Sequence, residues 1–126
     1  MKTEADVENL EKVIGQLEGA YTEISILAKK SPNDSLNPFK LNLINKVIAA
    51  ANAVLGDRYK PFDHFDQFDP DDVPTTSDVT MILSQYMEEV ERYRSDNVIY
   101  DGGWHYVVDG ESSEIPSGPP RKVGKK

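Results

Sequence analysis

The sequence predicts a mainly α-helical protein: an antiparallel three-helix bundle with a small C-terminal β-hairpin and a flexible basic tail. Apolar residues recur at the three- and four-residue spacing of amphipathic helices in three segments, about 3–30, 38–55 and 76–94. Short links between such helices favour antiparallel neighbours. Two short runs at about 98–108 then alternate apolar and polar residues around a turn, as in a hairpin. We therefore expect one domain over residues 1–110 and a tail over 111–126.

The first predicted helix starts at a capping-box pair, Thr3 and Asp6, and carries one apolar stripe. The stripe has heptad spacing and consists of Val7, Leu10, Ile14, Leu17, Tyr21, Ile24 and Ala28. It can pack inside a bundle, and it equally allows a homodimer through helix 3–30. Gly15 and Gly19 lie four residues apart within this helix, which allows a neighbouring helix to approach closely and favours a helix packed in a bundle.

The second and third helices have clear start signals. Asn37 followed by Pro38 is typical of a helix start, and Gly56 of a helix end. Between these points Lys46 is the only charged residue after Leu41, so we expect this helix to be the most buried. The third helix begins at a second pair with capping-box spacing, Thr75 and Asp78.

The charge of the chain is unevenly distributed. There are 14 basic and 22 acidic residues among 126, a formal net charge of -8. Four of the basic residues lie in the last six positions: Arg121, Lys122, Lys125 and Lys126. The preceding part is therefore more acidic than the total suggests. Such a surface disfavours nucleic acid and anionic membranes and favours basic partners.

Several classes of protein are not indicated by the sequence. Cysteine is absent, so thiolate zinc sites and disulfides are excluded. No apolar run reaches about 18 residues, and the acidic N-terminus is unlike a secretory signal. Phosphate-binding loops and H-E-x-x-H motifs are missing, and neither His64 nor His105 has a nucleophile context. We expect a cytoplasmic protein that is not an enzyme, with no cofactor and no membrane partner.

The most unusual stretch contains three Phe-Asp-x triplets. Phe62, Phe65 and Phe68 recur every third residue, and residues 63–78 hold six aspartates and no lysine or arginine. In one interpretation the rings close an end of the bundle and the aspartates solvate the loop. In another the rings anchor in a partner's pocket while the carboxylates attract a basic surface.

A third interpretation of this stretch is a divalent-metal site. The EF-hand pattern fails, because a loop starting at Asp69 has Val73 and Pro74 at positions 5 and 6. An irregular calcium or magnesium site is the only form left for this interpretation. No pattern in the sequence supports such a site, so we predict no metal-binding residue.

The predicted hairpin carries Trp104, the sole tryptophan, beside His105 and Tyr106. Because a lone hairpin is marginal in water, we expect Trp104, Tyr106 and Val108 to pack against the helices. An exposed Trp104 would instead anchor a partner.

The leading hypothesis is a small adapter or regulatory module that binds another protein with a basic or aromatic-accepting surface. The candidate partner-binding residues are Phe62, Asp63, Phe65, Asp66, Phe68, Asp69, Trp104 and Tyr106. One alternative is an acidic inhibitor that mimics nucleic acid and occupies a basic groove. Another is an enzyme with a carboxylate-bound divalent metal.

Overall fold

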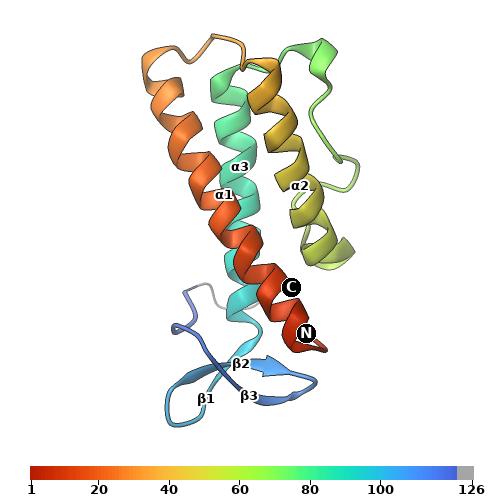
Figure 1. The fold of residues 1–126 in the computed structure, drawn as a ribbon, viewed down its shortest axis with the longest axis vertical. Coiled ribbons are helices and arrows are strands. Elements are labelled where there is room, and N and C mark those ends of the chain that lie inside the picture. The colour runs from red at the N-terminus through yellow and green to blue at the C-terminus, as the bar shows by residue number, and fades with distance from the viewer. Residues whose placement is uncertain (122–126) are drawn as a thin grey trace.

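The computed structural model describes residues 1–121, and this part contains three long helices and a small antiparallel sheet. The helices are α1 (Glu4–Lys30), α2 (Pro38–Tyr59) and α3 (Thr76–Ser95), with a short 3₁₀ helix η1 (Pro70–Asp72). The strands are β1 (Val98–Tyr100), β2 (Trp104–Val108) and β3 (Glu111–Pro116). The three long helices lie side by side, and the sheet lies at one end of them (Figure 1). The predicted mainly helical fold with C-terminal β-structure is confirmed.

The helix starts agree with the predicted caps. Thr3 and Thr75 each accept a hydrogen bond from the backbone N–H three residues later, and both capping boxes are complete. Asn37 accepts from the backbone N–H of Lys40, with Pro38 at the first position of α2. At Gly56 a φ of 66° breaks the helical path, where the sequence predicts the helix end, although helical turns continue to Tyr59. Local side-chain chemistry therefore sets these boundaries.

The apolar stripe of α1 packs against the other helices of the same chain. Val7, Leu10 and Leu17 are fully buried and Ile24 nearly so, mainly against α3, with which α1 forms the most extensive helix pair. The expected close approach at Gly15 and Gly19 is not found. Both residues are exposed, and a Cβ added at either one would meet nothing within 4 Å. The two glycines therefore do not mediate helix packing.

The helix expected to be the most buried is only partly enclosed. Ile44, Ile48 and Ala51 of α2 are buried in the core. On its other sides, however, Phe39 is 72% exposed and Leu43 46% exposed. A shortage of charge therefore does not make α2 the centre of the domain, because part of its apolar surface has no neighbour in the described chain.

The sheet has one strand more than the predicted hairpin. β2 pairs with β1 (Val98 opposite Tyr106) and with β3 (Val108 opposite Glu111), both antiparallel. Tyr106 is 2% exposed and belongs to the hydrophobic core. Positions 111–116, expected to begin the flexible tail, form β3, because the turn at Asp109 and Gly110 reverses the chain onto β2. Residues 122–126, with three of the four basic residues of the predicted tail, lie outside the described residues.

Residues 117–121 run along α3 and are fastened to it by contacts with Arg94 and Glu91, which form an ion pair within that helix. The buried Arg94 guanidinium donates to Glu91 at 2.8 and 2.9 Å, and also to the backbone oxygens of Gly118 and Pro119. Partial burial raises the pKa of the Glu91 carboxyl. Hydrogen bonds from Arg94 and Ser95, with the charge of Arg94, outweigh this effect and lower the pKa to about 2. The segment is thus held by a charged anchor that remains ionised at neutral pH.

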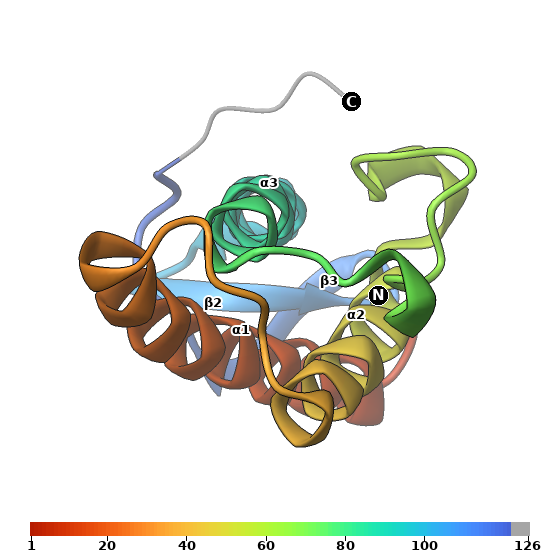
Figure 2. The same cartoon turned by 90° about the horizontal axis from the view of Figure 1, so that it is seen from above.

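The seams between neighbouring helices are unequally covered (Figure 2). The loop from Lys60 to Thr75 lies over α2 and α3, and its rings contact Tyr86 of α3. The segment 117–121 lies beside α3 on the side of α1 and shares a hollow with Ile14 and Gly15. Between α1 and α2 an open groove of about 980 Å³ remains, which we call the α1–α2 groove.

Candidate functional site

The three phenylalanines of the Phe-Asp-x triplets form one aromatic cluster in the loop between α2 and α3. Ring centroids of Phe62 and Phe65 lie 6.0 Å apart, and those of Phe65 and Phe68 5.2 Å apart, both edge to face. Phe62 and Phe65 also approach the Tyr86 ring at 6.4 and 6.5 Å. Such edge contacts add about 0.5–1.5 kcal/mol each to the burial of the rings. The three-residue spacing therefore does place the rings on one side.

The cluster faces the helices more than it faces solvent. Phe68 is 8% exposed and belongs to the core, whereas Phe62 and Phe65 are half-buried against it. The rings thus have a structural role, but they pack along the side of α2 and α3 and do not close an end of the helices. A partner can reach only the outer parts of Phe62 and Phe65.

Two asparagines of α2 hold the loop backbone, a role the sequence analysis missed. Asn45 donates to the Phe68 carbonyl at 3.0 Å and accepts from the Phe68 N–H at 2.8 Å. Asn52 donates to the Phe65 carbonyl at 3.2 Å and accepts from the Tyr86 hydroxyl at 2.8 Å. The two residues lie seven positions apart, hence on one face of a largely apolar helix, and that spacing was the available signal.

The carboxylates of the triplets are exposed to solvent, whereas the rings pack against the core. Asp63, Asp66 and Asp69 are all exposed. Asp69 also caps η1 by accepting from the Asp71 N–H at 2.9 Å, which fixes the end of the loop. The loop therefore presents acidic groups on a backbone that hydrogen bonds and ring packing hold in place.

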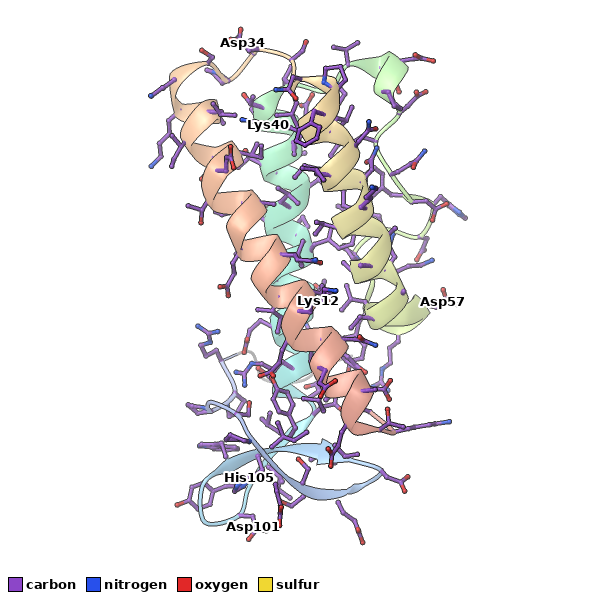
Figure 3. The ribbon with its side chains drawn as sticks, viewed as in Figure 1. Lys12, Asp34, Lys40, Asp57, Asp101 and His105 are labelled. Atoms are coloured by element: carbon purple, nitrogen blue, oxygen red, sulfur yellow. The ribbon has the colours of Figure 1, made fainter. Side chains whose placement is uncertain are left out.

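The aromatic residues of the sheet lie apart from the loop, at the far end of the helices (Figure 1). Tyr106 is buried, whereas Trp104 is half-buried, with its ring 5.5 Å from that of Tyr100. Of the three residues expected to pack against the helices, Tyr106 and Val108 do so. Asp101 marks the β1–β2 turn at the tip of the molecule, opposite Asp34 in the α1–α2 link (Figure 3). The candidate residues thus form two separate surfaces.

Within residues 1–121 no group of three or more histidine, aspartate and glutamate side chains could hold a metal ion. The aspartates of the loop are spread along it instead of converging. His64 is exposed, and the buried Nδ1 of His105 has no hydrogen-bond partner in the described chain. None of the helices in this part of the chain is both long and apolar enough to cross a membrane.

Comparisons with protein-family models, curated proteins and solved structures gave no significant match.

Proposed function

We propose that this chain is a small protein-binding module without catalytic chemistry, and that the loop 62–72 contacts a basic surface of its partner. The proposal depends on one observation: the exposed carboxylates of Asp63, Asp66 and Asp69 project from a loop that Asn45 and Asn52 hold in position. Opposite charges accelerate association and fix the orientation of a partner. A loop that is already ordered loses little conformational entropy on binding.

The rings have a supporting role in this proposal. Phe68 is buried and holds the loop on α2. The half-buried Phe62 and Phe65 leave ring edges beside the carboxylates, where a partner's apolar or cationic side chain can pack. The partner surface that fits best is basic, with apolar stems such as those of lysine and arginine.

The test compares two variants with the same change of charge. Asp63→Asn, Asp66→Asn and Asp69→Asn together neutralise the loop, and asparagine keeps the helix cap at position 69. Glu4→Gln, Glu8→Gln and Glu18→Gln together are the matched control on the exposed side of α1. Each full-length chain is immobilised and exposed to the same cell extract, and retained proteins are quantified by mass spectrometry.

We expect a set of basic proteins to be retained by the unmodified chain and by the α1 control. Their recovery should fall at least fivefold with the loop variant and should decrease as salt is raised. If no retained protein distinguishes the loop variant from the control, the loop is not a binding surface.

A second candidate function is a nucleic-acid-mimicking inhibitor. One observation favours it: Glu4, Glu8, Glu11 and Glu18 are exposed and recur at helical spacing along α1. An inhibitor of this kind would lose a DNA-binding partner when the α1 glutamates are neutralised, so the two variants have opposite outcomes under the two proposals. Release of labelled DNA from that partner by the unmodified chain would be the direct measurement.

A further inference from the structure

Two of the three helix seams are covered by segments of this chain, and the α1–α2 seam is open. The loop 62–72 lies over α2 and α3, and residues 117–121 lie along α3 beside α1 (Figure 2). Within residues 1–121 no comparable segment covers the α1–α2 groove, which is bounded mainly by the two helices themselves. A domain of this size normally buries such a surface or uses it for binding.

The floor of the groove is apolar and has the shape a helix requires. Its apolar residues are Val13 of α1 and Leu43, Val47, Ala50 and Val54 of α2. The small side chain at Ala50, with exposed Ala53 beside it, leaves room for a helix axis at the usual 8–10 Å.

The groove is long enough for several helical turns. Leu43 and Val47 also line a smaller hollow that continues along α1 to Ala20 and Ile24. It ends near the ion pair between Lys40 and Glu23, at 3.0 Å. At 1.5 Å per residue, the stretch of α2 from Lys40 to Val54 provides about 20 Å of contact, or roughly four turns of a partner helix.

The groove is flanked by positive charge, whereas the net charge of the chain is negative. Lys2, Lys12 and Lys46 line it, are exposed, and have no carboxylate within ion-pair distance in the described chain. Lys12 extends from the N-terminal half of α1 (Figure 3). The only acid among the lining residues, Asp6, already accepts the backbone N–H groups of Lys2 and Thr3. In a chain of net charge -8, three unpaired lysines beside one apolar groove form a local positive site.

We propose that the α1–α2 groove binds an acidic amphipathic helix of a partner protein. The apolar face of that helix lies on Leu43, Val47 and Val54, and its flanking glutamates or aspartates pair with Lys2, Lys12 and Lys46. Helices bound in grooves use this combination of apolar anchors at three- and four-residue spacing and charged edges. A second copy of the chain fits less well, because two such grooves would bring their lysines together.

This groove is separate from the loop 62–72 and has the opposite charge. The proposal for the groove can therefore fail its test while the proposal for the loop passes, and the reverse. The probes are two synthetic 18-residue amphipathic helices with leucines on one face. One carries glutamates on the other face, and the second carries lysines. Binding of each labelled peptide to the full-length chain is measured by fluorescence anisotropy at low and moderate salt.

The glutamate peptide should bind at least tenfold more tightly than the lysine peptide, although the net charge of the chain favours the lysine peptide. Lys12→Glu with Lys46→Glu should weaken binding of the glutamate peptide at least tenfold. Lys29→Glu with Lys30→Glu, an equal charge change at the exposed end of α1, should leave it within twofold.

Three results would overturn the proposal. The first is tighter binding of the lysine peptide, and the second is an equal effect of the two charge reversals. The third is a two-chain mass in sedimentation equilibrium that Leu43→Asp returns to one chain, since the groove is then occupied by a second copy. Leu43 is 46% exposed, so this substitution should leave the fold intact.

Discussion

The two sides of α2 differ in what covers them. On one side Asn45 and Asn52 hold the loop 62–72, and the Phe68 side chain of that loop is buried. On the other side Leu43 and Val47 line the α1–α2 groove, with lysines around them. Both sides belong to a helix in which Lys46 is the only charged residue between Leu41 and Gly56, yet only one side is closed by the chain itself. A helix that is apolar all round therefore indicates either burial or an unfilled interface, and sequence pattern alone does not separate the two.

The two sides of α2 should differ most in how much their apolar side chains contribute to the free energy of unfolding. Phe68→Ala should lower the free energy of unfolding by about 3 kcal/mol, because it removes a buried ring and leaves a cavity. Leu43→Ala should cost less than about 1 kcal/mol, because that side chain is already half in water. Urea unfolding of the two variants measures both values. Equal losses would mean that the groove is closed in solution.

The asparagine contacts give the next largest effect. Asn45→Ala removes two hydrogen bonds and leaves the backbone of the buried Phe68 unpaired, so we expect a loss of about 2 kcal/mol. Asn42→Ala on the exposed side of α2 is the matched control and should be neutral within about 0.5 kcal/mol. The same urea experiment applies, and a neutral Asn45 variant would show that the loop is not held by α2.

The segment over α3 and α1 should respond to acid. The pKa of Glu91 is lowered to about 2 from an ordinary value of 4.5, so its folded form binds a proton less readily than its unfolded form. The stabilisation is therefore complete above the unfolded pKa and is lost as the pH falls from about 4.5 toward 2.

Glu91→Gln should remove that part of the pH dependence and cost about 1.5 kcal/mol at pH 7, because it weakens the charged hydrogen bonds to Arg94. Thermal unfolding of both chains between pH 2 and pH 7 tests this. Parallel curves for the two chains would show that Glu91 does not hold the segment.

The smallest expected effect is a gain. Gly19→Ala should stabilise the chain by up to about 1 kcal/mol, because Gly19 is exposed within α1 and has open space around it. Destabilisation in urea unfolding would instead mean that another helix approaches Gly19 closely, as its spacing from Gly15 first suggested.

Much of the fold followed from local rules, because helix caps and apolar spacing act over a few residues. Thr3, Asn37 and Thr75 were assigned correctly for that reason. β3 was missed, because Ser112 and Ser113 lack the alternating apolar pattern and pair only through the turn before them. Contacts between distant segments are not encoded in local periodicity.

The candidate site was predictable only in part. The Phe-Asp-x repeat identified the loop and the common side of its rings, but not their burial, which depends on Asn45 and Asn52 of another element. The α1–α2 groove was not predictable, because its lysines come from three places: Lys46 from α2, Lys12 from α1 and Lys2 from the residues before α1. Only the packing of the helices brings Lys12 and Lys46 to one groove.

In our proposal the α1–α2 groove is the surface left open for a partner helix. The most direct measurement is a ¹⁵N NMR titration of the full-length chain with the glutamate peptide. We expect chemical-shift changes along the groove, at Lys12, Val13, Lys46, Val47 and Val54, with the loop 62–72 and residues 117–121 unaffected. Changes concentrated in the loop 62–72 or in residues 117–121, or no saturable change at all, would contradict binding of the helix in the groove.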